Sequence, residues 1–436
     1  MLTIEKIILS GFRNLGRNEI TLHDVTSLVA PNNYGKSNLL DAILFGANFI
    51  RASSEKKNSQ MRSRNVIPIN TQLEGAPFSY ELQGIVKRDE NLANFIYGYS
   101  FKWERNNSED RGACIFEEHL RIKSDEDPKY RNYIVREEKD AAYYLASPTG
   151  RCSKKLSVGG NVLAINKLSN FDDLFYLDIV TAINQISVKF VSTMRNPNEL
   201  FSTISPNNDV NSLTLQYPRT GEIGFYINSL KELDHDKYDL LHNTIMDLLP
   251  EIEEFKPVKV ILKHTEGQEE KNLPFLIPDA FYDIQVKERY NNQYSSINNL
   301  SAGCKRLLYI FTMVIASQIN NVQLVMLEEL ENSVHPKLLQ DVLVVISQLA
   351  GDTKILLTSH SPYLVNYLDV RKIQFGLPAK CGIATFKEVK ASKVSRLEKQ
   401  ASAEEMSLGE YVFGLMQDLE NDDEYIKTYF DTRDGR

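Results

Sequence analysis

The stretch VTSLVAPNNYGKSNLL, residues 25–40, decides the fold. Its first five residues can form a short buried strand, and from Leu39 onward the apolar residues recur at helical spacing. A tight loop between them ends in Gly35-Lys36-Ser37, where the helix is predicted to start. A loop of this kind is typical of phosphate binding, because its N–H groups and the helix N-terminus both attract an anion.

Each residue of the loop has a predicted role. Lys36 would reach the β- and γ-phosphates of a nucleotide, and the Ser37 hydroxyl would hold Mg²⁺. Asn33 stands where glycine is frequent, and asparagine tolerates positive φ. Ala30 replaces the first glycine of the pattern, and its methyl group would tighten the turn without blocking it.

Composition limits the class of protein. The chain has 436 residues, 42% of them hydrophobic, and a net charge of −8. The four cysteines are scattered without metal-binding spacing, no apolar run has the length of a membrane span, and residues 1–6 lack a signal-peptide pattern. We therefore expect a cytoplasmic protein without a membrane partner, in which any contact with nucleic acid needs a local basic patch.

A second group of motifs begins at residue 299. Leu300-Ser301-Ala302-Gly303 precedes a strong helical pattern over 307–319. Ser301 is a good N-cap, and Gly303 would let a backbone N–H approach a phosphate closely.

Two further strands carry candidate catalytic groups. The apolar run 322–327 ends in Glu328 and Glu329, and the strand 354–358 is followed by His360. Glu328 can hold Mg²⁺, and Glu329 can act as general base toward water. A histidine at this position can sense the γ-phosphate or orient the water.

The rest of the chain gives weaker patterns. We expect two or three strands in 1–30 and an antiparallel meander in 78–103 that extends through Ile115 and Tyr133. Residues 51–64 are predicted to form a solvated basic loop or, less favourably, a patch that contacts phosphate. Irregular structure is expected at 137–170 and a charged turn at 266–272. The remaining predictions are helices at 172–186, 230–249 and 404–430 and strands at 188–192, 258–262 and 283–286.

Taken together, the motifs resemble those of ATP-binding cassette ATPases of the SMC, RecF and OLD branch. The resemblance covers residues 1–390 and rests on the segments 10–14, 32–40, 300–303, 324–336 and 359–362. It implies an α/β fold: an ABC-ATPase head with a mixed or parallel core sheet, an antiparallel β subdomain and a helical insertion. The corresponding division is an N-terminal ATPase lobe (1–200), an insertion (201–295), a C-terminal ATPase lobe (296–390) and a helical tail (391–436).

The resemblance also implies a mechanism. Two heads would close face to face around ATP and Mg²⁺, with the loop of one subunit meeting Ser301 and Gly303 of the other. The implied nucleotide-binding residues are Arg13, Asn14, Asn32, Asn33, Gly35, Lys36, Ser37, Asn38, Ser301 and Gly303; the metal ligands are Ser37 and Glu328; the catalytic residues are Glu329 and His360. The Q-loop glutamine stays open between Gln72 and Gln83, and Arg195 resembles an arginine of these proteins.

The favoured function is an ATP-hydrolysing switch or sensor, a homodimer or larger homo-oligomer, in a bacterial anti-phage defence complex with a separate effector, a nuclease. The motivation is that the sequence shows neither coiled-coil arms nor a fused nuclease cluster. A RecF-like DNA-repair clamp and a non-hydrolysing nucleotide-bound scaffold are the alternatives. Ala30 and Glu328, which replaces the usual aspartate, favour slow hydrolysis.

Overall fold

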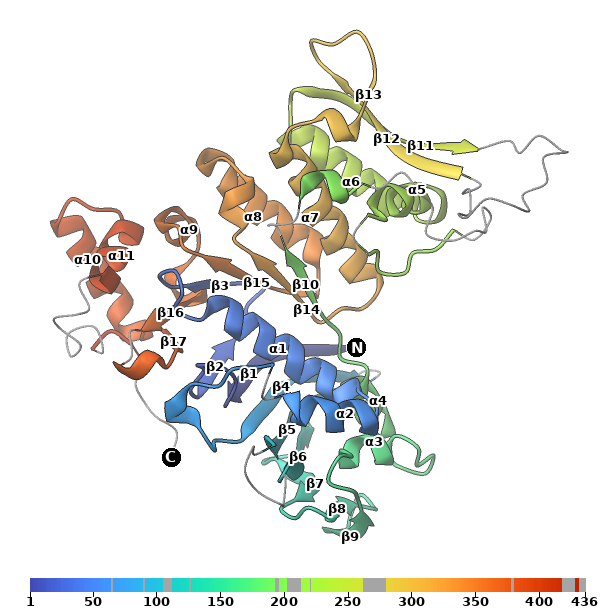
Figure 1. The fold of residues 1–436 in the computed structure, drawn as a ribbon, viewed down its shortest axis with the longest axis vertical. Helices are drawn as coiled ribbons and strands as arrows, with labels where there is room; N and C mark the ends of the chain where they lie inside the picture. The colour runs from blue at the N-terminus through green and yellow to red at the C-terminus, as the bar shows by residue number, and fades with distance from the viewer. Residues whose placement is uncertain are drawn as a thin grey trace, which may run out of the picture. The chain divides into compact units, whose positions relative to one another are not determined.

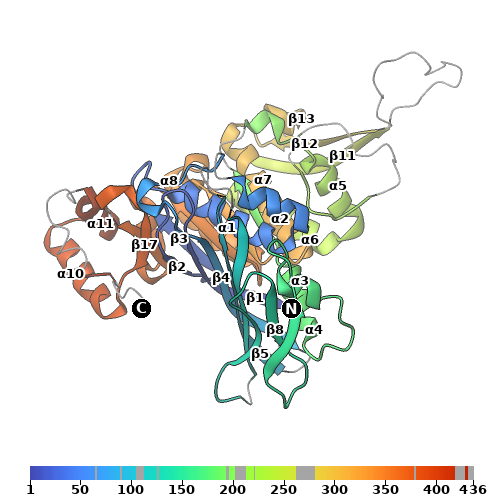
Figure 2. The same ribbon diagram turned by 60° about the horizontal axis from the view of Figure 1, so that its bottom comes forward.

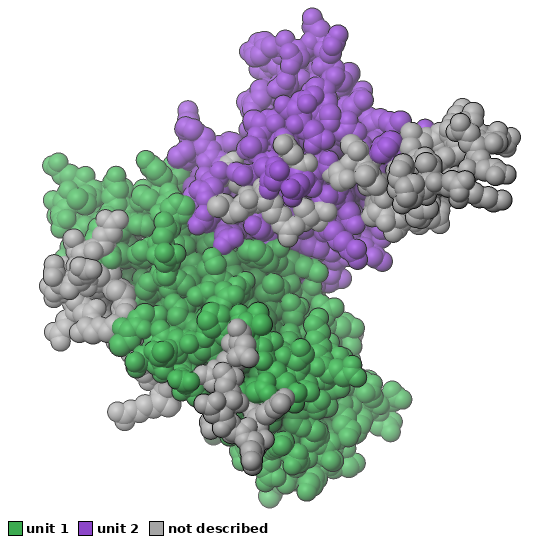
Figure 3. Space-filling model, viewed as in Figure 1, with its two compact units in different colours: residues 1–190, 323–326, 352–436 green, residues 191–322, 327–351 purple. Residues whose placement is uncertain are grey.

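The computed structural model describes residues 1–63, 66–88, 91–104, 112–124, 127–192, 196–201, 213–219, 221–261, 280–377, 380–417 and 428–430. These residues form two compact units (Figure 3). Unit 1 contains Met1–Phe190, Gln323–Met326 and Asp352–Arg436, and unit 2 contains Val191–Val322 and Leu327–Gly351. The division into four parts at 200, 295 and 390 stays a prediction.

An eight-stranded antiparallel sheet forms a large part of unit 1, in the order β2-β1-β4-β5-β6-β7-β8-β9 (Figures 1 and 2). Its strands are β1 (Leu2–Ser10), β2 (Asn18–Thr21), β4 (Phe78–Arg88), β5 (Asn91–Lys102), β6 (Cys114–Ser124), β7 (Arg131–Arg136), β8 (Ala141–Leu145) and β9 (Cys152–Ser157). The meander predicted from period-two alternation is confirmed, whereas the irregular structure predicted for 137–170 is wrong, since it contains β8, β9 and a short helix.

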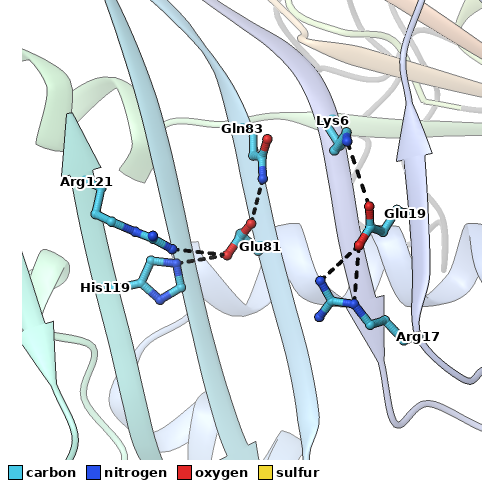
Figure 4. A network of polar contacts seen from close by, with 7 residues as sticks. All are labelled: Lys6, Arg17, Glu19, Glu81, Gln83, His119 and Arg121. Carbon is cyan, nitrogen blue, oxygen red and sulfur yellow. Dashed lines mark hydrogen bonds and ion pairs between the residues drawn. The ribbon is translucent and has the colours of Figure 1, made fainter. Parts of the chain in front are cut away.

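Helix α1 (Lys36–Arg51) packs on one face of this sheet (Figure 1). Phe49 of α1 stacks on Tyr99 and Phe101 of β5, with ring centroids 5.1 Å and 4.9 Å apart. The Tyr99 hydroxyl donates to the carbonyl of Gly46 at 2.8 Å. Successive side chains of a strand point to opposite faces, so the alternate residues carry a polar network on the other face. There Glu81 accepts from Gln83 and contacts His119 and Arg121, as Figure 4 shows.

A six-stranded sheet has the order β10-β14-β15-β3-β16-β17. Its strands are β3 (Val25–Val29), β10 (Val188–Ser192), β14 (Leu324–Glu328), β15 (Lys354–Ser359), β16 (Ile373–Leu377) and β17 (Thr385–Glu388). Strand β3 is parallel to both β15 and β16, while β16 and β17 are antiparallel. Strand β3 is buried at all five positions, as its apolar run predicts. The predicted fold class, mixed α/β with parallel and antiparallel sheets, is confirmed.

The remaining α-helices of unit 1 are α2 (Ser54–Met61), α3 (Ala164–Leu168), α4 (Leu177–Asn184), α9 (Pro362–Tyr367), α10 (Val394–Ala403) and α11 (Leu408–Gln417). The solvated loop predicted for 51–64 is wrong over α2. Ser53 caps this helix by accepting from the N–H of Lys56, and two residues of the helix, Lys57 and Met61, are buried. The helix predicted for 172–186 is longer than α4, and the helix predicted for 404–430 starts only at Leu408, with α11; residues 418–427 of that prediction lie outside the described residues.

Unit 2 combines helices with a small sheet. Helices α5 (Ile223–Leu233) and α6 (His235–Leu248) pack on a three-stranded sheet formed by β11 (Ile252–Ile261), β12 (Ala280–Glu288) and β13 (Ser295–Ser296). The single helix predicted for 230–249 is wrong, because Asp234 ends α5 and its side chain caps α6 by accepting from the N–H of Lys237. Helices α7 (Ala302–Ile319) and α8 (Pro336–Ala350) complete the unit.

The predicted turn at 266–272 and Arg195 lie outside the described residues. Short 3-10 turns occur at Thr71–Leu73, Pro197–Glu199, Ile297–Asn299, Leu330–Ser333, Val370–Lys372, Lys380–Gly382 and Ala391–Lys393. Over the described ranges, no helix combines the length and the apolar character needed to cross a lipid bilayer.

Candidate functional site

The loop between β3 and α1 has the backbone that the sequence predicts for a phosphate-binding loop. Asn33 lies in the left-handed region at φ 59°, and Gly35 has φ 124°. Gly35 is the N-cap of α1, and no side chain caps this helix end. The helix N-terminus therefore carries its partial positive charge beside the loop, where an anion would be stabilised.

Lys36 is folded onto its own loop. The side chain is only 7% exposed, and its ammonium donates to the carbonyls of Ala30 at 2.8 Å and Pro31 at 3.1 Å. Main-chain oxygens thus hold the cation at the mouth of the loop. An incoming phosphate offers the same ammonium a charged acceptor, which forms a stronger hydrogen bond than a carbonyl does.

Arg13, Asn14 and Asn38 form a brace across the start of α1. Arg13 donates to Asn38 Oδ1 and to Asp41 Oδ2, both at 2.7 Å, and Asn38 Nδ2 donates to Asn14 Oδ1 at 2.7 Å. Asn14 in turn donates to the carbonyl of Tyr34 at 3.3 Å. The structure therefore brings these three predicted residues together around the loop. Sequence reasoning missed Asp41, although it lies one helical turn after Ser37.

Tyr34 anchors the loop to β17, a contact that the sequence did not predict. Its hydroxyl lies 3.3 Å from both the N–H and the carbonyl of Thr385, and its ring meets Phe386 edge to face. Burial raises the pKa of Tyr34, so the hydroxyl stays protonated and can donate. The segments are 351 residues apart, and no local pattern reports such a pairing.

His360 follows β15, as predicted. Ser359 pairs with Val29 in the parallel ladder between β15 and β3, so His360 and Ala30 leave the sheet at the same edge. Ser361 caps α9 by accepting from the N–H of Tyr363, and Pro362 occupies the first turn. Carboxyl ends of parallel strands are where ligands bind in sheets of this kind.

The other predicted residues belong to unit 2. Ser301 is the N-cap of α7 and accepts from the N–H of Cys304 at 3.3 Å, which confirms its predicted structural role. Gly303 lies in the first turn of the same helix. The placement of these two residues across a dimer stays a prediction.

Glu328 is the last residue of β14 and Glu329 follows it, between two fully buried leucines, Leu327 and Leu330. Glu329 adopts a left-handed backbone conformation, φ 49° and ψ 57°. The side-chain amide of Asn332 donates to Glu329 Oε2 at 2.6 Å. Strained backbone at a predicted catalytic residue is consistent with a functional constraint.

The donor types fit Mg²⁺ and a nucleotide. The Ser37 hydroxyl, in the first turn of α1, and the Glu328 carboxylate, at the end of β14, are both hard oxygen donors of the kind that Mg²⁺ prefers. Ser37 belongs to unit 1 and Glu328 to unit 2, and their joint coordination of a metal stays a prediction.

Solved structures with a similar fold include three SMC heads. The first is an SMC head bound to the C-winged helix domain of ScpA, with 14% identity, TM-score 0.43 and coverage of 90% of this chain and 99% of that one. An SMC head domain from Thermotoga maritima has 12% identity, TM-score 0.41 and coverage of 89% and 100%. An SMC head with an extended coiled coil, bound to the C-terminal domain of ScpA derived from Pyrococcus furiosus, has 13% identity, TM-score 0.40 and coverage of 92% and 100%.

No curated protein matches the chain at a significant level. A family model does match it over residues 25–366, from the start of β3 into α9. This range includes the phosphate-binding loop, the two glutamates and His360, and it spans most of the sequence. The chain belongs to the family described as "AAA domain, putative AbiEii toxin, Type IV TA system".

Proposed function

We propose that this chain is an ATP-binding and ATP-hydrolysing switch subunit of a bacterial anti-phage defence complex in the cytoplasm. Two or more copies would close head to head around ATP and Mg²⁺ and control a separate effector, a nuclease. The γ-phosphate would favour the closed state, and hydrolysis would return the population to the open one.

The observation that carries the proposal is the position of Lys36. A buried ammonium held by two loop carbonyls, at the uncapped N-terminus of a 16-residue helix, is poised to exchange these carbonyls for phosphate oxygens. The shared sheet edge of Ala30 and His360 adds a group that can report on the γ-phosphate. Glu329 keeps its predicted role as general base, and Glu328 its predicted role as Mg²⁺ ligand.

The defence role has separate support. The description of the family names a putative AbiEii toxin and a type IV TA system. The proposal therefore predicts an effector encoded beside this gene whose activity depends on the nucleotide state of this chain.

The first test is mass by light scattering with and without ATP and Mg²⁺, on the wild type, Glu329→Gln and Lys36→Ala. We expect ATP to produce a dimer or larger assembly, most persistently in Glu329→Gln, and no change in Lys36→Ala. Phosphate release should accompany assembly in the wild type alone. An unchanged mass and no retained ATP in all three proteins would reject the switch.

A nucleotide-dependent assembly without phosphate release would support the scaffold alternative. ATP-dependent binding to duplex DNA with a steep salt dependence would instead support the repair clamp.

A further inference from the structure

The turn that follows β14, residues 328–333, holds Glu329 in a conformation that residues with a Cβ rarely adopt. Glu329 has φ 49°, and its neighbours Leu327 and Leu330 are completely buried. The leucines fix the chain on both sides, and the left-handed residue between them directs the carboxylate back over the turn.

Asn332 binds Glu329 twice. Its backbone N–H donates to the carbonyl of Glu329 at 3.1 Å, and its side-chain Nδ2 donates to Glu329 Oε2 at 2.6 Å. Asn332 is exposed, so its side-chain amide is not held in place by burial against other side chains. A donor on one carboxylate oxygen fixes the plane of the carboxylate, and with it the direction from which a proton can be accepted.

Asn332 is also tied to the start of α7. The guanidinium of Arg306 donates from Nη1 to the carbonyl of Asn332 at 3.4 Å. Arg306 stands in the second turn of the helix that Ser301 caps. One residue therefore connects Glu329 with the helix whose N-terminus carries Ser301 and Gly303.

We propose that Asn332 is the positioning residue for Glu329, and that Arg306 couples this position to the N-terminus of α7. The inference rests on the proposed ATP hydrolysis. In that reaction the water oxygen bonds to the γ-phosphorus, the bond from the γ-phosphorus to the bridging oxygen breaks, ADP leaves with the electron pair, and Glu329 accepts the proton of the water. Asn332 contributes only the orientation of the accepting carboxylate.

The chain contains a matched control for the hydrogen bond. Asn291 donates from Nδ2 to Glu288 Oε2 at 2.6 Å, and its backbone N–H donates to the carbonyl of Glu288 at 2.9 Å. The spacing, atoms and exposed setting are the same as in the pair of Asn332 and Glu329. Glu288 is not among the residues with a left-handed backbone, and it has no predicted catalytic role.

The experiment compares steady-state ATP hydrolysis by the wild type, Asn332→Ala, Asn332→Gln and Asn291→Ala. Losing a hydrogen bond to a charged group should lower kcat of Asn332→Ala about tenfold and leave KM for ATP nearly unchanged. Asn332→Gln, which keeps an amide donor, should recover part of kcat, and Asn291→Ala should hydrolyse ATP like the wild type. The thermal midpoint of each variant checks that the protein is folded.

Arg306→Met tests the coupling to α7. It should lower kcat in the wild-type background and have no further effect in Asn332→Ala, because the amide that it supports is already absent. Additive losses would overturn the coupling.

Wild-type kcat in Asn332→Ala, with hydrolysis lost in Glu329→Gln, would overturn the positioning role and leave the proposed function intact. An equal loss of kcat in Asn291→Ala would also overturn the positioning role, since removing the same hydrogen bond from a glutamate with no predicted catalytic role would then have the same effect. A wild type that hydrolyses no ATP would remove the proposed function and this inference together.

Discussion

Ala30, which directly follows β3, and Gly376, on the neighbouring strand β16, are matched in size. A Cβ on Gly376 would lie 2.5 Å from the Cβ of Ala30 and 2.6 Å from the ring of Tyr34. Ala30 is completely buried, so its methyl group occupies the space that Gly376 leaves on β16. The substitution of the first loop glycine is therefore accommodated on the sheet side of the loop, and Ala30 gives no structural reason to expect a disabled site.

Gly376→Ala should disturb the phosphate-binding loop. The added methyl group cannot fit without moving Ala30 or Tyr34, and overpacking of this kind costs about 1–3 kcal/mol. We expect a lower free energy of unfolding and weaker ATP binding, measured by thermal denaturation and by titration with a fluorescent nucleotide.

Combining Gly376→Ala with Ala30→Gly should restore part of the lost stability and part of the lost ATP binding, because the methyl group added at residue 376 then takes the space of the one removed at residue 30. The double-mutant cycle measures this coupling. Strictly additive effects would show that the two residues do not share the space.

Asn14 is expected to control nucleotide affinity through the loop. It accepts from Asn38 and donates to the carbonyls of Tyr34 and Gly382. Asn14→Ala removes all three bonds and should weaken ATP binding several-fold, at a stability cost of about 1 kcal/mol per bond. Asn14→Asp keeps the acceptor but adds a negative charge beside the proposed phosphate site, so it should bind ATP more weakly still.

Arg17→Ala is the control for the variants of Asn14. Arg17 lies in the adjoining turn, and its exposed ion pair with Glu19 is part of the polar network in Figure 4. Exposed ion pairs contribute little, so binding should not change. Titration calorimetry distinguishes the variants, and unaltered affinity in both Asn14 variants would contradict the bracing role.

The features predicted correctly from the sequence are those whose chemistry is local. Residues 25–40 contain the strand, the positive-φ asparagine, the lysine and the helix in one continuous run. Ser301 was identifiable as an N-cap because its acceptor and the N–H of Cys304 are three residues apart. Local patterns of this kind predict the structure correctly because the tertiary contacts favour the same local conformation.

The errors have equally specific causes. Helix α2 was missed because its buried face includes Lys57, a residue type that periodicity counts as polar. The break between α5 and α6 was missed because apolar spacing continues through Asp234. The sequence does contain a sign of this break, since an aspartate such as Asp234 can cap a helix by accepting from the N–H three residues later, here that of Lys237. The contact between Tyr34 and Thr385 depends on the fold, and the sequence contains no local sign of it.

Lys57 should make the free energy of unfolding depend on pH in the alkaline range. The side chain is 1% exposed and donates to the carbonyls of Ile50 and Ala52 at the end of α1. Burial lowers its pKa from 10.5 to about 8. Between these two values the unfolded chain binds more protons than the folded one, so stability rises with pH in that window.

The measurement is the free energy of unfolding of the wild type and Lys57→Met at several pH values. The difference between the two proteins should change in favour of the wild type from about pH 8 to pH 10.5, by up to about 1.4 kcal/mol per pH unit. Subtracting the variant cancels the contribution of the other groups that titrate there. Parallel curves would mean that Lys57 titrates alike in both states.

Gly409 allows α11 to dock on α9, the helix that follows His360. A Cβ at Gly409 would lie 2.1 Å from the carbonyl oxygen of Pro362, and its N–H donates to Asn366 Oδ1 at 2.8 Å. Gly414, on the same helix, has nothing within 4 Å of an added Cβ. Gly409→Ala should therefore lower the free energy of unfolding by about 1–3 kcal/mol. Gly414→Ala should leave the free energy of unfolding unchanged or raise it by about 0.5–1 kcal/mol, since alanine favours helix.

Thermal denaturation gives the order of stability of the two variants, and hydrogen exchange over 362–367 and 408–417 locates the change. If Gly414→Ala were the more damaging, the close approach of α11 to Pro362 would not be what holds these helices together. If the order is as expected and Gly409→Ala also slows ATP hydrolysis, the docked helices support the position of His360.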